Sequence, residues 1–314
     1  YKLGRNEESS RFIESALQLA PHYAEALEQK ALLLFIKNDW AGSEAEVKKG
    51  LAINPFLKDL WILLSAINKK QDRIEDATSA LEEAQKLDTE NTGLLINIGK
   101  LYSLQGNYEK SLWAFKKVVE LNPNNVSAWT NYADALRQAE YFEYAILAYD
   151  KALVLNKNLT WIYKNKALLL LELSRFDEAL LCYHKILAIS PDDYSTCNNL
   201  GRLYQRYKDY EKAIEYHKKA ISLDSKFAKA YYDLGNSLFH IRRLNNAIRY
   251  YKNAIFIDPK FTQAYFNLGV SLFMIGNFHE ALYYMQSVLQ KNLYDKNTIY
   301  YFFFYYNSKS KIYT

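Results

Sequence analysis

The sequence predicts an all-α solenoid of antiparallel helix pairs, and three observations carry this prediction. The chain has only 10 Gly and 5 Pro in 314 residues, which are too few turn-forming residues for a β-sandwich or a β-barrel. All five prolines lie on one grid with a step of 34 residues: Pro21, Pro55, Pro123, Pro191 and Pro259. Two columns of this grid hold only small residues. A fixed period of this length is typical of stacked helical repeats.

Eight complete units follow when each grid residue is numbered as position 32 of its unit. They are 24–57, 58–91, 92–125, 126–159, 160–193, 194–227, 228–261 and 262–295, with no insertion or deletion between them. Residues 1–23 are expected to be the end of a truncated unit with its turn at Gly4, so the sequence reads as a fragment. Residues 296–314 are expected to form a degenerate terminal helix, in which the aromatic Phe303 stands where the other units have a small residue.

Each unit is expected to contain a helix, a tight turn and a second helix. Positions 8 and 20 hold only Ala, Ser or Gly in all eight units, as two closely approaching helices require, while large residues at positions 4 and 24 fill the space beside them. Position 17 is Trp40 in the first unit and Phe278 in the last. It begins the second helix, after a turn such as Gln105-Gly106-Asn107. Position 32, Pro where present, ends the second helix.

Two kinds of segment in these units resemble tetratricopeptide repeats (TPRs). The stretches 129–136 (WTNYADAL) and 265–272 (YFNLGVSL) are each followed by a Phe-x-x-Ala sequence, and the resemblance covers residues 24–295. It implies a right-handed α-α superhelix, the TPR solenoid. In that fold the first helices line a concave groove that binds ligands, and positions 2, 5, 6, 9, 12 and 13 face the groove.

Position 6 is rich in asparagine. The six consecutive units from 92 to 295 carry Asn97, Asn131, Asn165, Asn199, Asp233 and Asn267 there, although 25 Asn in the whole chain predict only about half an Asn in six places. An amide offers a donor and an acceptor, which suits the backbone of an extended peptide. The row is similar to the asparagine ladder of the TPR arm in O-linked N-acetylglucosamine transferases. The alternative, that these are solvated groove residues, stays open.

The second half of the chain is basic. Residues 1–150 hold 17 Lys+Arg and 22 Asp+Glu, whereas residues 151–314 hold 23 and 13. The frame puts Lys164, Arg202, Arg206 and Lys229 in the groove, where guanidinium groups pair well with carboxylates. They are expected to select acidic side chains of a partner; a solvated face with local ion pairs is the alternative. The set partly resembles the carboxylate clamp of co-chaperone TPRs, but Leu168 and Asp233 depart from that pattern.

No catalytic or cofactor motif stands out. The sequence has no glycine-rich phosphate loop, no Gly-x-Ser-x-Gly elbow and no His-Glu-x-x-His helix, so neither catalysis nor a cofactor or metal is expected. Cys182 and Cys197 are predicted to be reduced core thiols of a cytoplasmic protein. The apolar runs are too short to span a membrane, and no signal segment opens the chain.

The expected function is therefore a protein–protein interaction scaffold that binds an extended peptide segment of a partner, possessing acidic residues, in its concave groove. A rival hypothesis is the substrate-recognition arm of a larger enzyme, such as a glycosyltransferase, whose catalytic domain lies outside this sequence. Binding of nucleic acid is not expected, because the excess of Lys and Arg is modest. The sequence makes no prediction of an oligomeric state.

Overall fold

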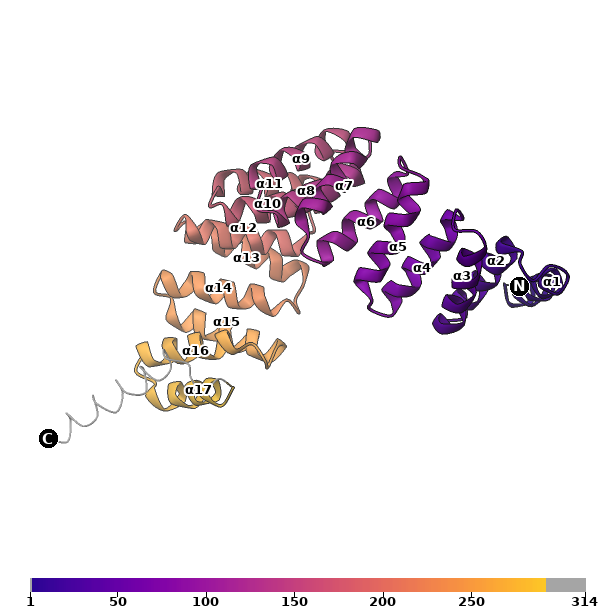
Figure 1. Ribbon diagram of the computed structural model, residues 1–314. Helices are drawn as coiled ribbons and strands as arrows, with labels where there is room; N and C mark the ends of the chain where they lie inside the picture. Colours follow the sequence, from indigo (N-terminus) through magenta and orange to yellow (C-terminus); the bar gives the residue numbers. More distant parts are fainter. Residues whose placement is uncertain (1, 292–314) are drawn as a thin grey trace. The chain divides into compact units, whose positions relative to one another are not determined.

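The computed structural model describes residues 2–291, and its regular elements over this range are all α-helices (Figure 1). The chain divides into two compact units, residues 1–162 and 163–314. Helix α1 (Lys2–Leu19) precedes eight helix pairs. The first helices of the pairs are α2 (Ala24–Ile36), α4 (Lys58–Lys70), α6 (Thr92–Leu104), α8 (Val126–Gln138), α10 (Thr160–Glu172), α12 (Tyr194–Arg206), α14 (Ala228–His240) and α16 (Thr262–Met274). The second helices are α3 (Trp40–Ile53), α5 (Ile74–Leu87), α7 (Tyr108–Leu121), α9 (Phe142–Leu155), α11 (Phe176–Ile189), α13 (Tyr210–Leu223), α15 (Leu244–Ile257) and α17 (Phe278–Lys291).

The helix boundaries follow the 34-residue grid, and the predicted fold class is confirmed. Each first helix begins at position 1 of a unit, and each second helix begins at position 17. One local prediction is wrong: α1 runs through Gly4 without a turn. A glycine inside a helix costs only about 1 kcal/mol, so the residue alone does not enforce a break. The predicted terminal helix, 296–314, and residues 292–295 lie outside the described residues.

The turn between the two helices of a pair has the same backbone conformation in all eight 34-residue repeats. The residue at position 15 has a left-handed φ, between 58° and 82°. The next N–H then reaches back to a carbonyl of the first helix; Asn107 N donates to Tyr102 O at 2.9 Å. Only Gly106 and Gly276 are glycines here. The other residues at this position are Asn38, Asp72, Glu140, Ser174, Lys208 and Arg242, which pay about 1–2 kcal/mol for this conformation.

The small-residue columns mark where the two helices of a pair touch. The Ser111 hydroxyl at position 20 donates to the Gly99 carbonyl at position 8 across a distance of 2.9 Å. A Cβ built on Gly235 would lie 2.5 Å from the Tyr251 ring. The predicted close approach is therefore confirmed, and the group that faces position 8 in this pair is the large side chain at position 24.

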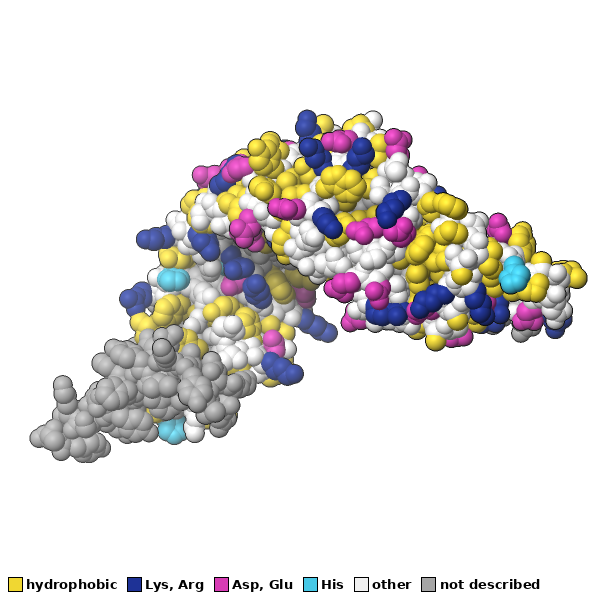
Figure 2. Space-filling view, in the orientation of Figure 1, with side chains coloured by type: hydrophobic (Ala, Val, Ile, Leu, Met, Phe, Trp, Pro, Cys, Tyr) yellow, Lys and Arg dark blue, Asp and Glu magenta, His cyan; other side chains and the backbone are white. Residues whose placement is uncertain are grey.

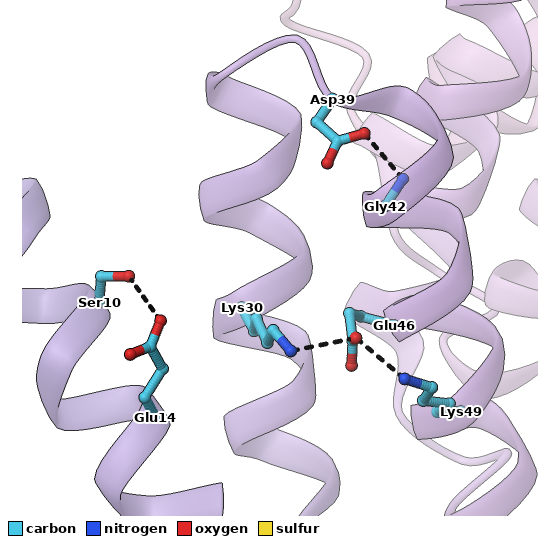
Figure 3. Close-up of polar contacts among 7 residues, drawn as sticks. All are labelled: Ser10, Glu14, Lys30, Asp39, Gly42, Glu46 and Lys49. Atoms are coloured by element: carbon cyan, nitrogen blue, oxygen red, sulfur yellow. Dashed lines mark hydrogen bonds and ion pairs between the residues drawn. The ribbon is translucent and has the colours of Figure 1, made fainter.

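Polar contacts fix the helix ends and join the helices of the first unit (Figure 3). The Asp39 side chain accepts a hydrogen bond from Gly42 N at 2.9 Å and caps the start of α3. Glu46 on α3 accepts from Lys30 on α2 at 3.1 Å and from Lys49 at 3.0 Å. Burial acts to raise the pKa of Glu46, but the two ammonium groups outweigh it and hold that pKa below its ordinary value.

First helices of neighbouring pairs contact one another. In the second unit α12 contacts α14, and α14 contacts α16; in the first unit α2 contacts α4, and α6 contacts α8. Within the described residues no comparable contact joins α13 to α15 or α15 to α17. Because the first helices are the closer set, they form the inner side of the curve in each unit. This is the side on which the sequence places positions 6, 9 and 13.

Candidate functional site

Three of the predicted site residues lie together on α12. Asn199, Arg202 and Arg206 are three and then four residues apart, so they share one face of the helix. They line a pocket of about 260 Å³ within the second unit. The end of α10 and the middle of α11 supply the opposite wall. The other lining residues are Leu171, Tyr183, Leu203 and Gln205.

The two arginines and the tyrosine of this α12 pocket are hydrogen-bond donors with few partners among the described residues. Arg202 and Arg206 are exposed, and neither forms an ion pair within the described residues. The Arg206 guanidinium lies 5.1 Å from the ring centroid of Phe176, a cation–π contact that leaves its N–H edge available. Tyr183 is 1% exposed, and its hydroxyl has no hydrogen-bond partner in the described part of the chain. Burial raises the pKa of Tyr183 to about 12 against the opposing charge of Arg202, so the hydroxyl keeps its proton at neutral pH.

Lys164, predicted to select acidic side chains of a partner, is engaged within the chain instead. Its Nζ lies 2.6 Å from Oδ2 of Asp193. Asp193 is the N-cap of α12 and also accepts from Thr196 N at 3.0 Å. Burial acts to raise the pKa of Asp193, but the bonds from Lys164, Thr196 and Ser195 hold it below its ordinary value. This local ion pair, which the sequence had left as the alternative, fixes the start of α12.

Asp233 departs from its predicted place in the groove row. Its side chain is buried, and Asn198 Nδ2 donates to its Oδ2 at 2.7 Å. Because Asn198 uses its NH₂ group in this way, its Oδ1 accepts from His217 Nδ1 at 2.7 Å. Burial raises the pKa of Asp233 and, together with the charge of Arg202, lowers the pKa of His217 to about 3. The carboxylate therefore belongs to a buried network that joins α12, α13 and α14.

The asparagine row is not uniform. Asn97 is exposed and lines a pocket of about 220 Å³ in the first unit, together with Lys69 and Lys100. Asn131 and Asn165 are half-buried.

In the second unit Asn267 donates to the Tyr232 hydroxyl at 3.1 Å and to Asn236 Oδ1 at 2.8 Å. Its NH₂ group is thus already occupied, and its carbonyl is the group left for a ligand. Lys229 is exposed near the start of α14 and forms no ion pair with described residues.

A second pocket, of about 320 Å³, adjoins the α12 pocket, and Gln205 lines both. The Gln205 amide donates to the Asp233 carbonyl and to the Ser237 hydroxyl, each at 2.7 Å. The other residues that line this second pocket are Asn236, Phe239, His240, Asn267 and Val270. Lys and Arg side chains gather over α12 to α14 in the space-filling view (Figure 2). The second unit therefore offers a cationic pocket beside one lined by amides.

Five tetratricopeptide repeat family models match the chain. They match residues 92–125, 114–140, 158–226, 228–261 and 263–292, which together make up more than half of it. The chain belongs to the tetratricopeptide repeat family. TPR proteins mediate protein interactions. No curated protein sequence matches this TPR chain.

Solved structures of TPR proteins share its fold. A TPR protein from Parabacteroides merdae ATCC 43184 is 20% identical with a TM-score of 0.54, over 79% of this chain and 98% of that one. YrrB, described as a TPR protein with an unusual peptide-binding site, is 22% identical with a TM-score of 0.50, over 60% and 96%. A chain of the APC/C hetero-tetramer Cut9–Hcn1 is 17% identical with a TM-score of 0.50, over 90% of this chain and 56% of that one. At these identities the similarity shows the TPR fold.

Some site residues could have been found from the TPR frame, and one could not. Gln205 and Asn236 occupy positions 12 and 9, which the frame assigns to the groove. Tyr183 occupies position 24, a core column in every unit, so nothing in its spacing points to a pocket.

Cys182 and Cys197 are both buried, in the predicted core positions of this TPR chain. Among the described residues no group of three or more His, Cys, Asp or Glu is arranged to hold a metal ion. No helix in that range has both the length and the apolar character to cross a membrane.

Proposed function

We propose that this TPR chain is an interaction scaffold that binds an extended segment of a partner protein on its first helices. The observation that carries the proposal is the α12 pocket. There Asn199, Arg202 and Arg206 present polar groups beside a hollow on the inner side of the second unit. Polar side chains with few internal partners on a packed scaffold are the groups that a ligand can satisfy.

The amides and the cations have different roles in this proposal. The amides that hold the backbone of the partner segment are those of Asn97, Asn131, Asn165, Asn199 and Asn267, because an amide can both donate and accept a hydrogen bond; Asn267 contributes its carbonyl alone. Arg202, Arg206 and Lys229 select its acidic side chains. The peptide-binding site described for YrrB supports peptide capture as a use of this fold. Lys164 and Asp233 take no part, since both are engaged internally.

The test compares proteins captured from a cell lysate by three immobilised forms of the chain. The groove variant changes Asn131, Asn165 and Asn199 to Ala. The matched control changes Asn245, Asn246 and Asn253 to Ala; these residues lie on the second helix α15, away from the inner side. Quantitative mass spectrometry measures which proteins each form retains.

We expect the wild-type chain and the α15 control to retain the same proteins, and the groove variant to lose them. Circular dichroism establishes that all three forms fold alike. Chemical crosslinking of a retained protein then identifies the residues it touches, and its bound segment should be rich in Asp and Glu. Equal retention by the groove variant would contradict binding on the first helices.

A further inference from the structure

The α12 pocket contains more hydrogen-bond donors than the chain itself satisfies. A guanidinium has five N–H donors and no acceptor, and Arg202 and Arg206 form no ion pair within the described residues. Tyr183 lines the same pocket, and its buried hydroxyl lacks any partner among the described residues. A buried polar group without a partner costs about 1–3 kcal/mol. The pocket is thus built for a ligand that accepts several hydrogen bonds.

The charge of the pocket is also uncompensated. Arg202 and Arg206 are four residues apart on one helix face, an arrangement in which like charges destabilise the helix. The carboxylate within the electrostatic reach of Arg202 is Asp233, which is also influenced by Lys229. Arg202 and Lys229 therefore act on one buried carboxylate that is already hydrogen-bonded to Asn198, and Arg206 adds a third cation on the same helix face as Arg202. A ligand with two negative charges would, together with Asp233, balance the three positive charges of Arg202, Arg206 and Lys229.

We propose that the α12 pocket binds the phosphate group of a phosphorylated side chain in the partner segment, an inference that rests on the proposed function. A phosphate monoester carries about −1.5 to −2 charges at neutral pH and three acceptor oxygens. Its oxygens can accept from Arg202, Arg206 and the Tyr183 hydroxyl together. A carboxylate has one charge and two oxygens, so it would leave part of this donor set unmet. The volume of about 260 Å³ exceeds what a bare carboxylate needs.

The experiment uses three degenerate peptide libraries that differ only in a fixed central residue: phosphoserine, glutamate or serine. Fluorescence anisotropy measures their binding to the full chain. We expect the phosphoserine library to bind about tenfold more tightly than the glutamate library, because it adds charge-assisted hydrogen bonds. Arg202→Gln/Arg206→Gln should abolish this preference. Lys218→Gln/Lys219→Gln removes the same charge from the exposed side of α13 and should retain it.

Tyr183→Phe tests the pocket without changing its charge. It removes only the hydroxyl, which has no partner to lose, so the melting temperature should stay the same or rise. The phosphoserine preference should fall several-fold. A lower melting temperature together with unchanged phosphopeptide binding would overturn the role assigned to this hydroxyl and, with it, the site.

Other outcomes separate this inference from the proposed function. Equal binding of the phosphoserine and glutamate libraries, lost in the arginine variant, would overturn phosphate recognition and leave acidic peptide binding standing. No binding of any library would overturn both. Binding of a 5′-phosphorylated oligonucleotide in the absence of peptide binding would also overturn the proposal, because the phosphate would then belong to a nucleic acid.

Discussion

Gly235 is the position at which the repeat frame can be tested most directly. It lies in α14 against Tyr251 of α15, and a Cβ there would be 2.5 Å from Cε1 and 2.7 Å from Cδ1 of the ring. Tyr251 is 1% exposed, and its hydroxyl donates to Asn236 Oδ1 at 2.8 Å. The ring is therefore held by packing on one side and by a hydrogen bond at its end. Gly235→Leu forces four carbon atoms into this contact.

The expected loss follows from a comparison within the chain. The unit 126–159 has Ala133 and Tyr149 at the same two positions, both buried, so the fold can accommodate one methyl group. For Gly235→Ala, a gain of about 1 kcal/mol in helix propensity opposes about 1–3 kcal/mol of overpacking. Leu adds three more carbons without such a precedent, and we expect the free energy of unfolding to fall by about 3 kcal/mol. For the compact unit 163–314, which contains Gly235, the melting temperature should fall by about 6–12 °C.

Far-UV circular dichroism during thermal and urea unfolding measures the change. Gly93→Leu is the control, because a Cβ at that exposed position near the start of α6 meets only the Asn91 side chain, at 3.2 Å. It should change the free energy by no more than about 1 kcal/mol, because only the helix propensity and a contact with one exposed side chain are altered. Shortening the facing side chain in Gly235→Leu/Tyr251→Ala should recover part of the loss. An unchanged midpoint for Gly235→Leu would refute the pairing of positions 8 and 24.

Three further predictions concern single groups. Burial raises the pKa of Asp233, so its ionised form is disfavoured in the folded chain; as pH rises from about 4 through that raised pKa, the wild type should lose stability. Asp233→Asn keeps an acceptor for Asn198 and should remove this dependence, so its melting temperature relative to wild type should increase from pH 4 to pH 8. Glu140→Gly should raise the free energy of unfolding by about 0.5–1 kcal/mol in urea titrations, because Glu140 has a left-handed φ of 63°. Ser111→Ala should lower it by about 1 kcal/mol, since the hydrogen bond to the Gly99 carbonyl is lost; no loss would mean that this bond contributes nothing.

The helix order could be predicted because it depends on short-range chemistry repeated eight times. Each unit buries the same faces against its neighbours, so position 8 must be small and position 24 large wherever a helix pair forms. Gly106 indicated the turn, and the residues at position 15 of the other seven units adopt the same left-handed backbone. At the start of the chain this reasoning failed, since the glycine at position 4 lies inside a continuous helix.

The candidate site could be predicted only in part. The frame placed Asn199, Arg202 and Arg206 on one side of α12, and the structure puts all three around one pocket. It could not show that Lys164 is paired with Asp193. That pairing depends on where a side chain of one helix meets the cap of another.

The sequence by itself determined the repeat length, the start of the second helix in each of the eight units, and the small and large core columns. These follow from the order of residues along one helix pair. Only the tertiary structure decided which polar groups have internal partners. Asp233 is buried against Asn198, whereas Tyr183, from a core column, lines the α12 pocket and has a buried hydroxyl without a partner among the described residues. The reason is that hydrogen-bond satisfaction depends on distances of a few ångströms between different helices, and a residue's position in a repeat does not fix those distances.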